Sequence, residues 1–479
     1  MKIAPILAAG AAVGAAIGLT GVIATVVGVG ILAVGAVLVT KALMKSMMPD
    51  MSDFSTQGSQ GIMVNKTGSS VSLPVVYGET RTGGVRVFTT TEGSIDNGTP
   101  EDPDVTPNPY LHLVYAICEG EINACKKIFF DGEEVMNTTA TGPNSSWTFV
   151  DSKYSGNVDA YFYSGTDTQS ANSALNGVAS WTGTPAFKGV AYMYFRMTYD
   201  ADVWKNGLPE ITFLIEGKKV PATSNGTTLQ YSDNPARCVL DYLSNSRYGK
   251  GIAVADIDLP SFQAAETYFT SKGWTTRGNL DTNANMFVNV LDLFANCRSY
   301  LAFGNKYRLI PEKAETTISL ALTDDNIIGD ITYALGDRTT MFNSMKAKIM
   351  NASDNYHDDL VIVSDATLKS QDNGIVLEAE VSFPYIKNAA QAQQIITEEI
   401  NQSRQSHLIE LTATIEAVDL QVGDLVTVTN ETFGITNKEF RVLMTELLPS
   451  SEVTLSLREY DADVYGSSII TDAKGDNNS

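Results

Sequence analysis

The feature that most limits how this chain can fold is a long uncharged run near its N-terminus. No charged residue occurs from Ile3 to Thr40, and as one helix this run would extend about 57 Å, nearly twice the roughly 30 Å core of a bilayer. A secretory signal peptide has a much shorter apolar region. We therefore predict that residues 1–48 form an apolar helical segment that must be sheltered from water.

Glycines recur in this segment at helical spacing. They are Gly10, Gly14 and Gly18, four residues apart, and Gly21, Gly28 and Gly35, seven residues apart. Each set falls on one face of a helix, where missing side chains allow a second backbone to approach closely. We assign these six glycines to helix packing in a channel or in a membrane. A plain anchor with incidental glycines is the alternative, and the spacing fits either one long helix or two shorter helices.

The rest of the chain is acidic. The whole chain carries a net charge of −22, although the only charged residues among the first 48 are Lys2, Lys41 and Lys45. Such a surface repels phosphate unless a basic stripe is concentrated on it, and the sequence has no such stripe. We therefore expect no sequence-specific binding of nucleic acid.

Strand-favouring residues alternate with clusters of Gly, Ser and Asn, which predicts a mainly β fold with α/β insertions and domains of barrel or sandwich type. The predicted order is a linker at 49–61, a first β domain with loop insertions at 62–220, a small α/β domain at 221–315, a second β domain with one long helix at 316–465, and a disordered acidic tail at 466–479.

Local signals place individual elements. Asp131-Gly132 predicts a hairpin turn, and the four prolines of the range 94–109 predict a surface loop. Asn234-Pro235 predicts the start of a helix. A second helix is predicted at about 284–299, followed by a hairpin of residues 300–303 and 306–310, and a long polar helix at about 386–405.

Groups that could support catalysis or bind a metal are sparse. His112, His357 and His407 lie in no HExxH or similar frame. The paired carboxylates Glu119 with Glu121, and Asp131 with Glu133 and Glu134, are expected at turns. Asn279 to Asn283 partly matches a calcium loop but lacks its glycine and its final glutamate. The four cysteines form no CxxC pair and are expected to be buried thiols. We predict no catalytic residue, metal or cofactor; a glycan-cleaving enzyme that uses Glu119 or Glu133 is a minor alternative.

Several stretches together resemble one family, and they do so in the same order. They are Leu73–Phe88, Leu111–Ile122, Gly207–Val220, Tyr231–Ile252, Val290–Lys313 and Leu420–Asn430. The family is that of the J-like tip attachment, or host-specificity, proteins, which form the tail-tip hub of long-tailed phages. The resemblance covers residues 73–465, and the chain lacks the C-terminal receptor-binding region of the fuller members.

The resemblance implies a homotrimeric, non-enzymatic hub of tube-like β domains that closes the distal end of a phage tail tube and opens for DNA ejection. The implied partners are further copies of the chain, the tape measure protein, distal tail proteins and fibre or receptor-binding proteins. The apolar segment would plug the channel or enter the host envelope during infection. A membrane-anchored bacterial surface protein with acidic β binding domains is the alternative.

Overall fold

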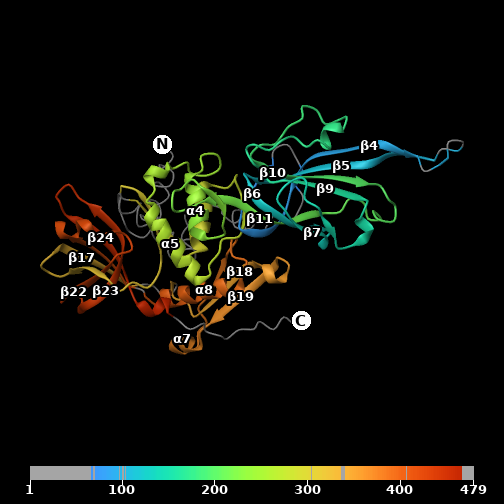
Figure 1. Cartoon of the computed structure of the whole chain (residues 1–479). Coiled ribbons are helices and arrows are strands. Elements are labelled where there is room, and N and C mark those ends of the chain that lie inside the picture. The colour runs from blue at the N-terminus through green and yellow to red at the C-terminus, as the bar shows by residue number, and fades with distance from the viewer. Residues whose placement is uncertain are drawn as a thin grey trace.

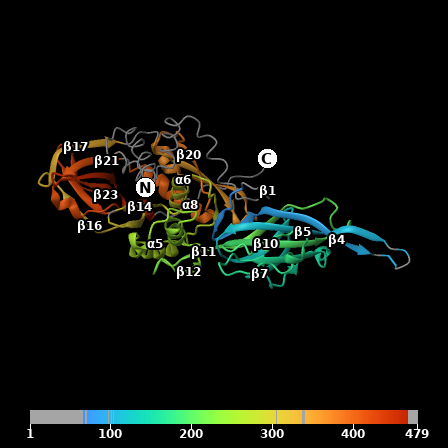
Figure 2. The ribbon, with the colours of Figure 1, turned by 90° about the horizontal axis from the view of Figure 1, so that it is seen from above.

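The structure is a computed structural model, and it describes residues 66–67, 71–96, 98–99, 102, 104–303, 305–335, 340–405 and 407–466. These residues form an elongated body (Figure 1). A β sandwich lies at one end, a part rich in helices lies in the centre, and a curled sheet lies at the other end, as the second view also shows (Figure 2). The predicted mainly β fold with helical insertions is confirmed.

The sandwich packs two sheets face to face, with strand orders β1-β4-β5-β10-β9 and β12-β11-β6-β7-β8, and with β3 paired to β11. Its strands are β1 (Lys66–Thr67), β3 (Glu79–Gly83), β4 (Val85–Asp96), β5 (Val105–Glu119), β6 (Ile122–Phe130), β7 (Glu133–Ala140), β8 (Thr148–Phe149), β9 (Val158–Tyr163), β10 (Val190–Thr198), β11 (Ile211–Pro221) and β12 (Leu229–Tyr231). Buried side chains of both sheets, including Tyr115, Phe195 and Phe213, form one apolar core. Short 3-10 helices lie at Ser152–Tyr154 and Leu175–Gly177.

The predicted turn at Asp131-Gly132 is confirmed, and it joins β6 to β7. The φ angles of Asp131 and Gly132 are 48° and 91°. A two-residue hairpin loop of this twist needs positive φ at both positions, which Asp and Gly tolerate better than most residues.

The predicted surface loop at 94–109 is wrong over half of its length, at 94–96 and 105–109, which belong to strands. β4 continues to Asp96 and β5 begins at Val105, and Ser94 pairs with Pro107. Proline is tolerated in a strand that has a neighbour on one side, because the missing N–H then faces the open edge. Among the described residues, the neighbour of β5 on its other side, β10, reaches no further than Tyr110.

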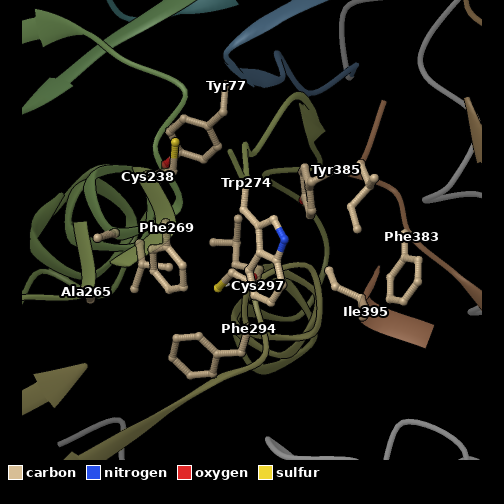
Figure 3. Packing of buried hydrophobic residues seen from close by; sticks show 14 of the residues in the cluster. Tyr77, Cys238, Ala265, Phe269, Trp274, Phe294, Cys297, Phe383, Tyr385 and Ile395 are labelled. Carbon is tan, nitrogen blue, oxygen red and sulfur yellow. Dashed lines mark hydrogen bonds between the residues drawn. The ribbon is translucent and has the colours of Figure 1, made fainter. Parts of the chain in front are cut away.

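The central part packs helices against short strands around one apolar core (Figure 3). Its elements are β2 (Val75–Tyr77), α4 (Pro235–Ser244), a 3-10 turn at Val254–Asp256, α5 (Leu259–Lys272), β13 (Gly278–Leu280), α6 (Met286–Ala295), β14 (Ser299–Phe303), β15 (Tyr307–Pro311), β18 (Ser344–Asn351), a 3-10 turn at Ala352–Asp354, β19 (His357–Ser364), α7 (Ala366–Gln371), β20 (Glu378–Ser382) and α8 (Ala389–Ser403). Trp274 lies in the middle of this core, with Phe269 stacked on it at 6.2 Å between ring centroids.

The helices predicted for this region are confirmed, with shorter bounds. The side chain of Asn234 accepts a hydrogen bond from the amide of Ala236, so it caps α4 as predicted. α6 is followed by the hairpin β14–β15, and α8 is the long polar helix, with Ile395, Ile396 and Ile400 on its buried side. The helix α8 shares the central core with α4 and α5. The predicted domain division at residue 315 stays a prediction.

The C-terminal sheet has the strand order β16-β22-β23-β24-β21-β17. Its elements are β16 (Ile318–Leu322), β17 (Ile327–Leu335), β21 (His407–Ala413), a 3-10 helix at Ile415–Asp419, β22 (Leu425–Asn430), β23 (Ile435–Leu447), β24 (Val453–Glu459) and a 3-10 helix at Ala462–Tyr465. Both edge strands contribute to its core, with Leu322 from β16 and Ile331 from β17, so the sheet curls around a single cluster.

The predicted barrel is therefore not closed within the described residues, where β16 and β17 are not paired with each other. The turn that joins them is held by Asn326, whose side chain accepts from the Thr323 amide and donates to the Ala321 carbonyl. After this turn β17 pairs with β21 instead of returning along β16.

Candidate assembly surfaces

An arm formed by the outer parts of β4 and β5 projects beyond the sandwich (Figures 1 and 2). β4 and β5 stay paired out to Asp96 and Val105, whereas β10 accompanies β5 from Glu119 only to Tyr110. Within the described residues, the outer strands of the arm are thus paired with each other alone. An isolated two-stranded ribbon is at best marginally stable in water, so this arm is suited to contact with another protein.

The arm is acidic. No lysine or arginine occurs between Arg86 and Lys126, whereas Glu92 and Asp96 lie on β4 and Asp102 and Asp104 lie near the tip. The carboxylate of Asp96 accepts hydrogen bonds from the amides of Gly98 (3.0 Å) and Asp104 (2.9 Å). These bonds hold the two strands together where the chain turns.

The base of the arm is fixed to the sandwich by a buried histidine. His112 on β5 is 4% exposed. Its Nδ1 lies 2.8 Å from the hydroxyl of Tyr194 on β10, and its Nε2 lies 3.6 Å from Glu92. Burial lowers the pKa of His112, which favours the neutral ring. The geometry supports a positioning role for His112 in place of the general base that a lone histidine could suggest.

The two edges of the C-terminal sheet form a second candidate surface. Among the described residues β16 and β17 have one neighbouring strand each, β22 and β21. Ile318 on β16 and Ile328 on β17 are each 37% exposed. An edge strand of this kind presents unpaired amides and carbonyls that can bond to a strand of another chain.

The carboxylates that sequence reasoning considered for catalysis do not come together in a site. Glu119 pairs with Arg247 at 2.8 Å, and Glu121 with Lys219. Glu134 pairs with Lys127 at 2.7 Å. Asp131 accepts a bond from the Glu210 amide at 2.8 Å, so it serves the turn. Each of these groups is engaged in an ion pair or a turn, and Glu133 lies exposed at the start of β7.

The remaining histidines and the stretch at 279–283 have structural contacts. His357 lies 3.7 Å from Asp354 on an exposed turn, and His407 contacts the hydroxyl of Tyr333. Asp281 accepts bonds from the Asn283 amide and the Ser72 hydroxyl, so it closes a local turn. No group of three potential metal ligands occurs in the described part of the chain.

The six glycines assigned to helix packing, Gly10, Gly14, Gly18, Gly21, Gly28 and Gly35, lie outside the described residues. The predicted apolar helix lies outside them too, and so does the predicted acidic tail apart from Gly466. Among the helices that the structure describes, none is both long enough and apolar enough to cross a bilayer.

Sequence reasoning missed both the arm and the open edges of the C-terminal sheet. The arm had a weak signal in the β-branched residues Thr90, Thr91 and Ile95, but the prolines that follow obscured it. The edges had no local signal, because strand order depends on pairings between residues that are distant in the sequence.

Comparisons with known proteins give the resemblance independent support. Residues 300–445 match the model of a family described as putative phage tail protein. The baseplate hub protein pb3 of Escherichia phage T5 is 24% identical over 480 residues, in a match that covers 84% of this chain and 49% of that protein. The chain thus spans about half the length of this curated relative.

A solved structure has a similar fold throughout. A chain of the virion of a native gene transfer agent particle superimposes with a TM-score of 0.61 at 15% identity, covering 98% of this chain and 99% of that chain. At this identity the likeness concerns the fold alone. Together with the two matches in sequence, it confirms the resemblance to phage tail hub proteins.

Proposed function

We propose that this chain, which resembles phage tail hub proteins in sequence and in fold, is a structural hub subunit at the distal tip of a phage-type tail. The observation that carries the proposal is the match to a baseplate hub protein over 84% of the chain. In this role three copies surround an axis and close the tail tube, and the closure opens when DNA is ejected.

The shape of the described chain supports such a role. An arm lies at one end of the body and a curled sheet with two open edges at the other (Figure 1). Open edges suit pairing between neighbouring copies, because the strands of one subunit can continue the sheet of the next. The arm suits contact with a further tail protein. The proposal assigns no catalytic role to the chain.

The apolar segment has a place in this proposal. Lys66 and Thr67 pair in parallel with Val85 and Arg86, so the described chain starts on the sandwich beside β4. Three copies would bring three apolar segments to one axis, where their glycines allow close packing. Burial of apolar surface is favourable at about 25 cal/mol per Å2. The same gain in free energy favours a plug of these segments in the channel and, after the channel opens, their insertion into the host envelope.

The remaining partners follow from the same role. The hub would anchor the tape measure protein on its inner side, and distal tail and fibre or receptor-binding proteins on its outer side. This chain would act in the virion and, during infection, at the host envelope.

Immunogold labelling of purified particles tests the location. Antibodies raised against the arm should place gold at the end of the tail farthest from the head. Labelling along the whole tail, or absence of label from particles while the chain fractionates with host membranes in cells without virus, would favour the bacterial surface protein instead.

Light scattering on the full chain in mild detergent tests the assembly. A protein mass of about three chains, or roughly 155 kDa from the 51.6 kDa subunit, is expected. A subunit that stays monomeric at high concentration, even with its neighbouring tail proteins, would contradict the proposed ring.

A further inference from the structure

Charged side chains are buried where the central part meets the C-terminal sheet. Glu312, which follows β15 and is fully buried, accepts a hydrogen bond from Arg298 at 3.1 Å on the side of the central part. On the side of the C-terminal sheet it contacts Arg458 of β24, and it accepts a bond from the hydroxyl of Tyr465 at 3.2 Å. One carboxylate is therefore shared by two arginines from the two parts.

The surrounding groups extend this arrangement, which we name the charged junction. Its members are Lys272, Arg298, Glu312, Glu398, Glu399, Arg441, Arg458 and Tyr465. Arg298 pairs with Glu398 at 3.1 Å and with Glu399, both on α8. Lys272 of α5 reaches Glu398 at 3.3 Å. The elements α5, α8, β23, β24 and the C-terminal 3-10 helix thus each contribute a charge or a hydroxyl to it.

The arginines are held in defined positions. Arg298 is 2% exposed and has a φ of 43°, a left-handed conformation that costs free energy in a residue other than glycine. Arg441 donates to the carbonyls of Lys313 (2.5 Å) and Gly423 (3.3 Å), and its guanidinium lies 5.1 Å from the ring of Tyr460. The contacts at the junction must offset the free-energy cost of this strain and of the desolvation of the charges.

Apolar burial contributes less at this boundary than within either part. The large apolar cores of the central part and of the C-terminal sheet are separate clusters in the described chain. Val422 packs at the margin of the central core, and a small cluster of Leu425, Tyr460, Val464 and Tyr465 lies beside the charged junction. Buried ion pairs are stabilising only in good geometry, and the loss of one partner leaves an uncompensated charge. Such a boundary holds one geometry well and tolerates few intermediates.

We infer that the charged junction is a latch: it holds the C-terminal sheet in one orientation on the central part, and loss of the pair between Glu312 and Arg458, which joins the two parts, releases the sheet as a unit about the segment that follows Glu312. This inference does not depend on the proposed function, because it concerns two parts of a single chain.

The carboxylates also make the latch sensitive to pH. Burial raises the pKa of Glu399 to about 7, although the nearby Arg298 opposes this shift. Burial raises the pKa of Glu398 as well, whereas the pKa of Glu312 is lowered, because its arginine partners outweigh burial. The other groups that face these carboxylates are Lys272, Arg298, Arg441, Arg458 and the tyrosines Tyr268, Tyr300 and Tyr465.

Proton linkage gives the direction in which pH changes the equilibrium between the closed and the released junction. A carboxyl whose pKa is about 7 in the closed junction and ordinary when released binds a proton more tightly in the closed state. The stabilisation that this carboxyl gives to the closed state is fully present below its ordinary pKa. It is lost as the pH rises through 7. Because 21% of the Glu399 side chain is still exposed, opening should increase by at most about tenfold between pH 6 and pH 8.

Hydrogen–deuterium exchange on the full chain in mild detergent tests the latch without any particle. The amide of Glu312 donates to the carbonyl of Arg298 at 2.7 Å, and the amide of Glu315 donates to the hydroxyl of Tyr460 at 2.7 Å. Because the bond of Glu315 joins the segment after Glu312 to the C-terminal sheet, faster exchange of this amide within residues 312–317 reports release. Glu312→Gln should speed this exchange about tenfold or more and leave β5 and β10 unchanged.

Two further variants keep the test decisive. Tyr465→Phe removes a single donor to Glu312, so it can report release even if Glu312→Gln does not fold. Glu399→Gln imitates the protonated carboxyl and should reduce the difference between pH 6 and pH 8, after correction for intrinsic exchange rates. Glu378→Gln is the matched control, because it breaks an exposed pair with Lys346 by the same chemical change.

The outcomes separate clearly. Faster exchange confined to residues 312–317 and the C-terminal 3-10 helix supports the latch. Exchange that rises equally in the sandwich and the central core, or that does not rise at all in Glu312→Gln and Tyr465→Phe, would overturn it.

Discussion

At the scale of the residue, a buried acid joins three segments of the central part near β11 of the sandwich. Asp241 on α4 is 2% exposed. Its Oδ2 accepts bonds from the hydroxyls of Tyr77 at 2.8 Å and Tyr248 at 2.6 Å. Burial raises the pKa of Asp241, and Lys218 opposes this shift. One side chain thus joins β2, α4 and the segment after α4.

Removal of this acceptor should be costly. Asp241→Ala leaves two hydroxyls without their acceptor in a buried site, and we expect a loss of about 3 kcal/mol in the free energy of unfolding. Asp241→Asn keeps one acceptor and should cost less. Asp354→Ala, at a side chain that is 70% exposed, is the control and should change little. Thermal unfolding followed by calorimetry measures all three; equal effects of Asp241→Ala and Asp354→Ala would contradict the role of Asp241.

A glycine next to this network has no room for a side chain. A Cβ at Gly249 would lie 2.0 Å from the carbonyl oxygen of Tyr242 and 2.8 Å from that of Asn245. Gly249→Ala should therefore destabilise the protein by about 2 kcal/mol or more. Gly142→Ala is the matched control, because a Cβ there meets no atom within 4 Å. Similar unfolding midpoints for the two variants would show that the backbone at Gly249 relaxes freely.

At the scale of the element, sequence predicts what is local and misses what is not. The turn at Asp131-Gly132, the cap at Asn234 and the hairpin after α6 follow from a few neighbouring residues, and all three are confirmed. α5 was not predicted. Its apolar residues Phe262, Ala265 and Phe269 are buried, but polar and small residues between them leave a weak helical pattern.

The candidate surfaces show the same limit. The prolines at 107 and 109 predict a loop when read alone, and only the short reach of β10 explains why a strand tolerates them. The charged junction unites residues from positions 272 to 465, so no spacing in the sequence could reveal it.

Shortening of the arm should separate folding from assembly. Replacement of residues 94–107 by an Asn-Gly turn removes strands that pair with each other and leaves the sandwich core intact. The thermal midpoint should change by no more than about 2 °C, since an isolated ribbon adds little stability. In a complementation assay with a phage that lacks this gene, the shortened chain should fail to yield complete tails. Normal tails would show that the arm is dispensable.

At the scale of the whole molecule, the described chain is a series of three parts, two of which meet at the charged junction. The sandwich, the central part and the C-terminal sheet each have an apolar core. The charged junction lies at the boundary between the central part and the C-terminal sheet, and Asp241 of α4 lies near Lys218 of the sandwich strand β11. Parts joined in this way can keep their own folds while their relative orientation changes.

The cysteines offer a measure of how intact these parts are. Cys118, Cys125, Cys238 and Cys297 are all buried, and burial raises the pKa of Cys118 and of Cys297 to about 12. Because the thiolate is the reactive form, a thiol reagent at pH 8 should label almost none of them in the native chain and all four in guanidinium chloride. Rapid labelling of the native chain would show that a core opens on the timescale of the reaction.

The edge strands of the C-terminal sheet also create a risk of aggregation before the subunit assembles. The backbone of β16 and β17, which within the described ranges is unpaired on one side, can bond to any extended peptide that a newly made subunit meets, including misfolded copies of itself. The cell can limit this hazard by supplying neighbours at the same time and in matched amounts. The order and proportion in which tail proteins are synthesised would then matter for solubility as much as for architecture.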